Sequence, residues 1–346
     1  MSYEYERIAT PKVGLRLHLN ENTAGCSPKV IAALQSLTRQ QAAEYPDYDA
    51  AVEATANRLG VSADELLLTN GLDEGLLAVS IVALRSHASY PEAIVVVPAF
   101  DMYAACADAV GGRVIEVPLN ADFSFPLAAV QRAITPDTRL IFLTSPNNPT
   151  GLCIPRENVL DLARSAPNAI VLVDEAYADF AGESLLDERE ARVARSMPNL
   201  LIGRTFAKAY GLAGLRAGAL IGSPETLAAI RRVVPPYSLN ICATVALVAG
   251  LQDLEYYNWY LAQVRASKAL LYEALDRRQI QYWPSSANFV LARFGEQATE
   301  VVEGLKARDV FVRDKSRDPA CPGCLRITTG VVEHTRTLLG ALEEIL

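Results

Sequence analysis

The chain has 346 residues, a net charge of −8 at neutral pH, and hydrophobic side chains at 51% of its positions. This length and composition predict a globular α/β protein with one large domain and a smaller one attached. No run of Lys or Arg is long enough for a nucleic-acid or anionic-lipid surface, which argues against both as main partners.

The N-terminal residues, the lengths of the apolar runs and the cysteines indicate the cellular location. Residues 1–10 are polar and mixed in charge, so we expect no signal peptide, and no stretch approaches the roughly 20 apolar residues of a membrane span. The six scattered cysteines favour a reducing, cytoplasmic location. Only Cys321 and Cys324 form a CxxC pair. Without a second pair or a nearby histidine, we interpret it as a turn and expect no metal.

Between residues 64 and 222, short runs rich in Val, Ile and Leu alternate with longer helical patterns. Most of these runs lack polar alternation, which is typical of parallel strands with helices on both faces. The pattern therefore predicts a large, doubly wound, mainly parallel sheet. In chain order, the expected strands are 65–69, 94–97, 114–117, 140–144, 170–174, 200–204 and 219–221.

After Pro235-Pro236 the pattern changes to a long helical stretch over about 243–278, with a break near Gln252-Asp253. Strand-like segments follow at 288–293, 310–313 and 325–328, with helices between and after them. This predicts a smaller C-terminal α/β domain. We place the large domain at 28–240 and the small one at 241–346, joined by the N-terminal segment 1–27.

In doubly wound sheets ligands bind at the carboxyl ends of the strands, so the residues after each apolar run are of interest. The first such segment, Asn70-Gly71-Leu72-Asp73-Glu74, opens an apolar helix. The free N–H groups and positive end of a helix N-terminus suit a phosphate. An ordinary turn, with Asp73 or Glu74 favouring the first helical turn, is the alternative.

Two further segments follow buried strands. Residues 145–151 read Ser-Pro-Asn-Asn-Pro-Thr-Gly, a rigid loop whose asparagines can form hydrogen bonds, or a plain turn. Asp174 ends another apolar run, where a buried carboxylate needs a cation or a donor. It could cap the next helix or pair with a protonated ring nitrogen, with Tyr177 one turn away.

Lysine and arginine stand at three further positions of interest. Lys208 lies in a glycine-spaced loop after the strand at 200–204. Lysine forms Schiff bases when its surroundings deprotonate the amine, although a solvated loop lysine is the alternative for this residue in isolation. Arg313 and Arg326 lie in strand patterns, where each needs an anionic partner such as a carboxylate.

Taken together, these motifs resemble the fold type I pyridoxal-phosphate (PLP) enzymes, and specifically the class I and II aminotransferases of the histidinol-phosphate aminotransferase type. The resemblance covers nearly the whole chain and depends on the order of the motifs and on their spacing. The gap from Lys208 to Arg216 is eight residues and that from Arg313 to Arg326 is thirteen. The matching segments are 19–22, 44–46, 71–74, 145–151, 174–177, 205–216 and 323–328.

The resemblance implies an aminotransferase that moves an amino group from a small-molecule donor, with histidinol phosphate as the leading candidate, to a 2-oxo acid acceptor. Lys208 would hold PLP as a Schiff base and move the substrate proton as general acid and base. Asp174 would pair with the pyridine nitrogen. Asn148 and Tyr177 would hydrogen-bond the phenolic oxygen of the cofactor.

The same resemblance assigns the remaining cofactor contacts. Phe100 would stack on the PLP ring. Backbone groups near Leu72 and Asp73, together with Thr205 and Arg216, would hold the phosphate.

The resemblance also implies contacts to a second subunit and to the substrate. Tyr45 matches a tyrosine that reaches the phosphate across a dimer interface, so we expect a homodimer. Arg326 would bind the substrate carboxylate, Arg313 the distal phosphate of histidinol phosphate, and Asn22 would also belong to the substrate site. The chain departs from the family at Thr23-Ala24-Gly25, where an aromatic or bulky residue often closes over the substrate.

Other functions stay open at this stage. Within the PLP enzymes, these are an aminotransferase for another amino acid, such as an aromatic one, and a decarboxylase acting on an amino-acid phosphate. Outside them, a nucleotide-binding dehydrogenase would need a GxGxxG loop, and Gly211, Gly214 and Gly218 lack that spacing. The presence of Lys208, Asp174 and Arg326 argues against a non-catalytic binding protein.

Overall fold

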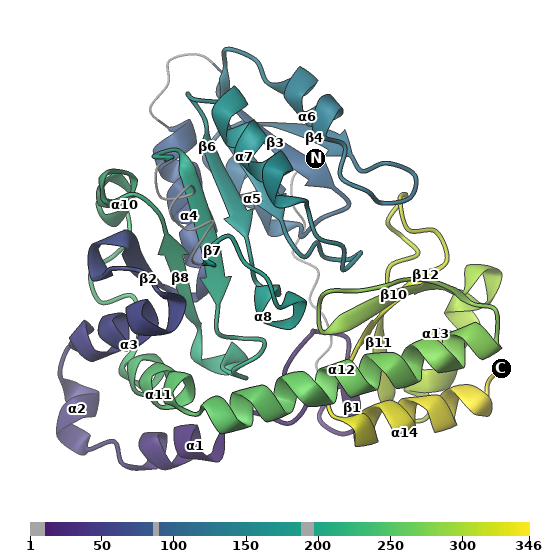
Figure 1. Cartoon of the computed structure of the whole chain (residues 1–346). Helices are drawn as coiled ribbons and strands as arrows, with labels where there is room; N and C mark the ends of the chain where they lie inside the picture. Colours follow the sequence, from purple (N-terminus) through teal and green to yellow (C-terminus); the bar gives the residue numbers. More distant parts are fainter. Residues whose placement is uncertain (1–10, 86–89, 188–196) are drawn as a thin grey trace.

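The computed structural model describes residues 11–85, 90–187 and 197–346 of the chain. These residues form a larger unit around a seven-stranded sheet and a smaller unit around a five-stranded sheet. One long helix, α12 (Leu254–Arg277), runs from the larger unit along the smaller one (Figure 1). The predicted α/β architecture, with a large sheet and a smaller C-terminal unit, is confirmed.

The strands of the larger sheet lie in the order β2-β8-β7-β6-β5-β3-β4. Strand β8 is antiparallel to its neighbours β2 and β7, and the other pairs are parallel. The expected doubly wound, mainly parallel sheet is therefore present. The strands, each within a few residues of its predicted range, are β2 (Leu66–Asn70), β3 (Glu92–Val97), β4 (Arg113–Pro118), β5 (Thr138–Thr144), β6 (Ile170–Asp174), β7 (Leu200–Thr205) and β8 (Ala217–Ile221).

Both faces of this sheet are buried, which explains the continuous apolar runs of its strands. In β5, Leu140 and Phe142 pack on one face, and Ile141 and Leu143 pack on the other, because successive side chains of a strand alternate. The first face is covered by α4 (Gly71–Leu84), α5 (Met102–Ala109) and α10 (Pro224–Arg231). The second is covered by α1 (Pro28–Gln35), α3 (Asp49–Leu59), α6 (Leu127–Ala133), α7 (Arg156–Ser165) and α11 (Ile241–Gln252).

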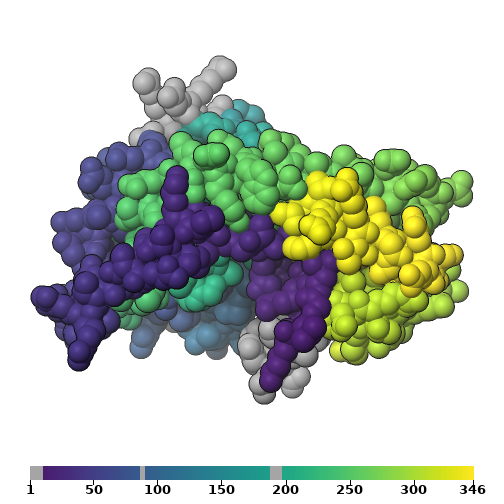
Figure 2. Space-filling view, turned by 90° about the horizontal axis from the view of Figure 1, so that it is seen from below, coloured from purple at the N-terminus to yellow at the C-terminus, as the bar shows by residue number. Residues whose placement is uncertain are grey.

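The smaller sheet has the strand order β1-β11-β12-β10-β9. Strand β1, from the N-terminal segment, pairs in parallel with β11, and Figure 2 shows this purple segment lying against the yellow-green C-terminal unit. The sequence did not predict β1 or β9, because a strand of three residues is too short to show a pattern. The elements are β1 (Leu15–Leu17), β9 (Gln281–Trp283), β10 (Phe289–Arg293), β11 (Val310–Asp314), β12 (Cys324–Thr328), α13 (Ala298–Lys306) and α14 (Val332–Glu343).

The predicted break in the long helical stretch falls at Asp253, between α11 and α12. The carboxylate of Asp253 accepts hydrogen bonds from Ser27 Oγ and from Lys29 Nζ, which joins the start of α1 to this corner. Side chains of α11, among them Ala246 and Leu247, belong to the same core cluster as the large sheet. Packing of the larger unit thus continues past residue 240, and the domain boundary placed there stays a prediction.

The CPGC sequence forms a turn that leads into β12, where the backbone N–H of Cys324 donates to the carbonyl oxygen of Cys321 at 3.1 Å. Both thiols are free and buried. Within the described ranges, no group of three or more His, Cys, Asp or Glu side chains is arranged to hold a metal ion. No helix among the described residues has the length and apolar character needed to cross a membrane.

Candidate active site

A cavity of about 930 Å³ lies where the carboxyl ends of the large-sheet strands meet the smaller unit. Strand ends, helix N-termini and the N-terminal segment all contribute to its lining, as expected for a doubly wound sheet. The structure brings most of the predicted site residues together here, and only Tyr45 and Asn22 lie outside the lining. The predicted residues that line it are Leu72, Asp73, Phe100, Asn148, Asp174, Tyr177, Thr205, Lys208, Arg216, Arg313 and Arg326.

Asp174 ends β6 at the floor of the cavity, with 5% of its surface exposed. Its carboxylate accepts a hydrogen bond from the Tyr103 hydroxyl at 2.7 Å and another from the Ala176 backbone N–H at 2.8 Å. Burial raises the pKa of this carboxyl to about 6, although these two donors and the charge of Lys208 act in the opposite direction. The carboxylate is held rigidly and is poised to meet a cationic group.

Tyr103, on α5, also lines the cavity, and the sequence analysis did not identify it. The Thr144 hydroxyl donates to its phenol oxygen at 2.9 Å, so the Tyr103 proton is directed to Asp174. Burial is the main cause that raises the pKa of Tyr103 well above its usual value, so the phenol keeps its proton. A tyrosine in an apolar helix gives the same sequence pattern as a core residue, and no signal distinguished it.

Lys208 lies in the loop after β7, on the side of the cavity facing the N-terminal segment. Its Nζ donates to the carbonyl oxygen of Leu19 at 3.2 Å and lies 5.9 Å from the centroid of the Tyr177 ring. The loop turns at Gly211, where φ is +72° and an added Cβ would lie 2.5 Å from the Gly25 carbonyl oxygen. Glycine at this position therefore lets the N-terminal segment close against the lysine loop.

Arg216 and the start of α4 form a cradle at one end of the cavity. The guanidinium donates to Asp73 Oδ2 at 2.5 Å, and a Cβ on Gly71 would lie only 2.5 Å from the Arg216 Nη2 atom. Glycine thus allows Arg216 to lie across the helix N-terminus, beside the free N–H groups of the first turn. With the Thr205 hydroxyl nearby in the lining, this cradle suits a phosphate.

Arg326 on β12 approaches the cavity from the smaller unit and is buried. Its guanidinium donates to Asn148 Oδ1 and to the His18 carbonyl oxygen, both at 2.6 Å, and both acceptors are neutral. Burial lowers the pKa of this arginine to about 10. Arg313 stands directly opposite on β11, so two guanidiniums on neighbouring strands line the cavity and favour anionic groups.

Asn148, Phe100, Tyr45 and Asn22 complete the predicted set. Because Asn148 Oδ1 is occupied by Arg326, its Nδ2 is the atom left to donate into the cavity. Phe100 meets Tyr103 edge to face at 5.8 Å. Tyr45 is 79% exposed and stacks on Tyr237 with ring centroids 4.4 Å apart, away from the cavity.

Asn22 is buried beside the lysine loop. Its Nδ2 donates to the Ala209 carbonyl oxygen at 3.0 Å, and its Oδ1 accepts from the Ala24 N–H at 2.9 Å. In the described structure the side chain fastens the N-terminal segment, and its role as a substrate ligand stays a prediction.

A family model for class I and II aminotransferases matches residues 12–342. The chain belongs to this aminotransferase family. The histidinol-phosphate aminotransferase of Moorella thermoacetica is 35% identical over 99% of this chain and 88% of its own length. Histidinol-phosphate aminotransferase 2 of Ralstonia nicotianae is 38% identical over 96% of this chain and 88% of its own.

Solved structures agree with the sequence matches. The histidinol-phosphate aminotransferase of Sinorhizobium meliloti, solved in complex with pyridoxal 5′-phosphate, superposes with a TM-score of 0.84. The two sequences are 27% identical, and the match covers 96% of this chain and 91% of that one. This aminotransferase therefore shares the family fold over nearly its whole length.

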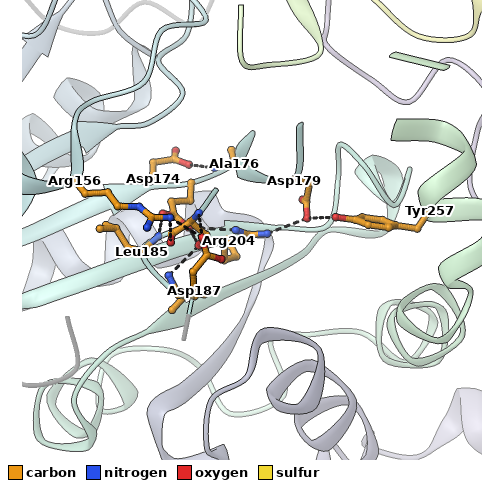
Figure 3. Close-up of polar contacts among 11 residues, drawn as sticks. Arg156, Asp174, Ala176, Asp179, Leu185, Asp187, Arg204 and Tyr257 are labelled. Carbon is orange, nitrogen blue, oxygen red and sulfur yellow. Dashed lines mark hydrogen bonds and ion pairs between the residues drawn. The ribbon is translucent and has the colours of Figure 1, made fainter. Parts of the chain in front are cut away.

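Beneath the cavity of this aminotransferase lies a buried ion-pair network that the sequence analysis did not identify (Figure 3). Arg204 on β7 binds Glu175 at 3.2 Å and Asp179 at 3.0 Å, and the Tyr257 hydroxyl of α12 donates to Asp179 at 2.9 Å. Burial disfavours the Arg204 charge, but the two carboxylates raise its pKa above the ordinary value. An arginine inside an apolar strand was the signal that could have indicated such a network.

The network joins two segments that carry predicted catalytic residues. Glu175 directly follows Asp174, the last residue of β6, and Tyr177 lies between Glu175 and Asp179. Arg204 directly precedes Thr205 and the lysine loop. The network therefore fixes the carboxylate and phenol relative to the strand that leads to the lysine.

Proposed function

We propose that this chain is a PLP-dependent aminotransferase that takes histidinol phosphate as amino donor and a 2-oxo acid as acceptor. The observation that carries this proposal is one cavity in which Lys208, Asp174 and the Arg216 cradle stand around a common space, with two arginines at the other side. The names of the relatives support the donor.

The residues present fit the cofactor. The cradle at Gly71 and Arg216, which a Cβ on residue 71 would fill, suits its phosphate. Burial raises the pKa of the Asp174 carboxyl to about 6, and among the described residues no cation is bonded directly to it. This buried carboxylate suits a protonated ring nitrogen. The Nδ2 of Asn148 and the Tyr177 hydroxyl suit the phenolic oxygen.

When bound, the cofactor would supply an electron sink for the substrate carbon that loses its proton. The Nζ atom of Lys208 would remove and return that proton as general base and acid. Asp174 would keep the ring nitrogen protonated, and the hydrogen bonds from Tyr103 and Ala176 would hold its carboxylate in position.

The two arginines of the smaller unit account for two anionic substrates. Arg326 donates hydrogen bonds to two neutral oxygens, those of Asn148 and His18. It would exchange these bonds for, or add to them, a bond to the carboxylate of the acceptor. Arg313 would bind the distal phosphate of the donor. Ala24 is exposed and Thr23 binds the backbone of Val331, so neither covers the cavity with a bulky side chain.

The test is the absorption spectrum of the purified protein with PLP, before and after addition of L-histidinol phosphate without acceptor. We expect a protein-bound cofactor band that changes with the donor and returns with a 2-oxo acid. The Lys208→Ala variant should lack the bound band, whereas Lys306→Ala, an exposed lysine on α13, should keep it. A band that responds only to aromatic amino acids would overturn the donor, and release of CO₂ would indicate decarboxylation. No band at all would overturn the cofactor assignment.

We propose in addition a cytoplasmic homodimer. The six free cysteines are consistent with a reducing compartment. Tyr45, exposed and outside the cavity lining of its own chain, would contact the cofactor phosphate of a second copy. Mixing the inactive Lys208→Ala variant with Tyr45→Ala at limiting cofactor should restore roughly a quarter of wild-type activity, through one intact site in each mixed dimer. No restoration, or a monomer by light scattering, would contradict this.

A further inference from the structure

Asn20, a residue of the N-terminal segment with no assigned role, is buried beside the catalytic groups. Only 1% of its surface is exposed, and it lines the cavity next to Leu19, whose carbonyl oxygen accepts from Lys208. Its backbone has φ +55°, the left-handed region that asparagine tolerates better than most residues. The Asn288 side chain donates to its carbonyl oxygen at 3.2 Å and fixes this conformation.

The hydrogen bonds around Asn20 determine which way its carboxamide faces. The Asn20 backbone N–H donates to the Thr328 hydroxyl oxygen at 3.1 Å, and that hydroxyl donates its own proton to Asn20 Oδ1 at 3.0 Å. The carboxamide oxygen is therefore turned to Thr328, and the NH₂ group is turned away from it. The Nδ2 atom lies 3.0 Å from the Tyr177 phenol oxygen.

This arrangement has a consequence for the proton of Tyr177. A carboxamide NH₂ group can only donate, so the Tyr177 oxygen must accept from Asn20. The Tyr177 O–H then points elsewhere, and Tyr177 lines the cavity. If the carboxamide were reversed, its oxygen would attract the Tyr177 proton and withdraw it from the cavity.

We propose that Asn20 is a positioning residue that directs the Tyr177 O–H into the cavity, with Thr328 fixing the orientation of the Asn20 carboxamide. The inference rests on the proposed function, because the acceptor of the Tyr177 hydrogen bond in the cavity would be the phenolic oxygen of the cofactor. A donor to that oxygen stabilises its negative charge and so lowers the pKa of the bound chromophore.

The experiment measures the chromophore pKa from the pH dependence of its absorption band. Asn20→Asp keeps the shape but has only acceptors, and Asn20→Gly removes the side chain while tolerating the left-handed backbone. We expect each to raise the chromophore pKa by roughly 0.5 to 1 unit, the size of one hydrogen bond. Thr328→Val should give a smaller rise in the same direction. Glu21→Gln changes the neighbouring residue, which pairs with Arg16, and should leave the value unchanged.

The decisive comparison repeats these substitutions in a Tyr177→Phe background. If Asn20 acts through the phenol proton, Asn20→Gly should cause no further shift there, because no hydroxyl remains to be directed. An equal shift in both backgrounds, or an unchanged chromophore pKa in Asn20→Asp with wild-type Tyr177, would overturn the role of Asn20 while leaving the cofactor assignment intact. Absence of any bound chromophore in the wild-type protein would instead overturn the proposed function.

Discussion

Two buried arginines, one in the larger unit and one in the smaller, are held in different ways. On the side of the larger sheet, Arg204 contacts the carboxylates of Glu175 and Asp179. On the side of the smaller unit, Arg326 contacts the neutral oxygens of Asn148 and His18. The electrostatic result is opposite in sign: the pKa of Arg204 is raised, and burial lowers the pKa of Arg326 to about 10.

We interpret the Arg204 charge as one that supports the fold, and we propose that the Arg326 charge binds a ligand. A buried ion paired within the protein stabilises the folded state only as part of its network, and removing one partner leaves the others uncompensated. A buried ion held by neutral groups carries a desolvation cost that an anionic substrate can offset. Stability and activity should therefore respond differently to substitutions at the two arginines.

The largest effect is expected for Arg204→Met. The substitution leaves the carboxylates of Glu175 and Asp179 buried without their cation, and it should lower the free energy of unfolding by roughly 3 to 5 kcal/mol. Urea unfolding followed by circular dichroism measures it. Arg164→Met, which removes a half-exposed ion pair with Asp161, is the matched control and should change stability by less than about 1 kcal/mol. Equal losses in the two variants would remove the distinction drawn for Arg204.

The next effect concerns activity on the same side of the cavity. Asp174→Asn keeps the shape but removes the charge that would stabilise a protonated ring nitrogen. Its single carboxamide oxygen can accept from only one of the two donors, Tyr103 and Ala176. We expect kcat/KM to fall by about 10² to 10³-fold, the usual cost of losing one preorganised electrostatic group. Steady-state transamination assays measure it. A fall of less than tenfold would mean that the Asp174 charge is not required.

The same substitution should have the opposite effect on the stability of the cofactor-free protein. Burial raises the pKa of Asp174 from 3.8 to about 6, so the folded chain binds this proton more tightly than the unfolded chain. Ionisation of Asp174 therefore lowers the free energy of unfolding as the pH rises from about 4 to about 6, and the loss persists at higher pH. Asp174→Asn should be more stable than wild type at about pH 8 and lose this advantage towards pH 4. An advantage independent of pH would contradict the assignment.

Arg326→Met tests the other side of the comparison. It removes two hydrogen bonds to neutral oxygens but also a buried charge, so the free energy of unfolding should change by no more than about 1 kcal/mol. In contrast, kcat/KM for the 2-oxo acid should fall by about 10 to 100-fold, because a charge-assisted contact to its carboxylate is lost. Unfolding and half-reaction kinetics on one protein sample measure both. A loss of stability as large as that of Arg204→Met would mean that Arg326 is structural.

The sequence could predict those features of the molecule that leave a local pattern. The large strands were predictable because both their faces are buried, as in Leu140 to Leu143, and the runs are long. Lys208, Asp174 and Arg326 could be selected as candidate site residues because charged residues in or beside apolar runs stand out in the sequence. Strand β1 was not predicted because three residues are too few to show an alternating pattern.

Two site features could not be read from the chain because they depend on distant contacts. Tyr103 looks like a core residue until its hydroxyl is seen 2.7 Å from Asp174, 71 positions away. Asn20 belongs to a segment singled out by family resemblance, but its partners Tyr177 and Thr328 are 157 and 308 positions distant. Local patterns indicate which residues carry charge, whereas the direction of a proton depends on the folded neighbours.

The smallest effect is expected for Tyr103, one of the two hydrogen-bond donors to Asp174. Its hydroxyl donates to Asp174 and lowers the pKa of that carboxyl, so Tyr103→Phe should raise the Asp174 pKa above about 6. Cofactor binding should then weaken at a higher pH than in wild type as the pH falls, because the protonated carboxyl cannot stabilise a cation. Thr144→Val removes only the donor to the Tyr103 oxygen, and because Tyr103 can still donate to Asp174, it should shift the profile less. Titration of cofactor affinity against pH separates the three proteins. Identical profiles for Tyr103→Phe and wild type would mean that burial and the Ala176 N–H suffice to set the Asp174 carboxylate.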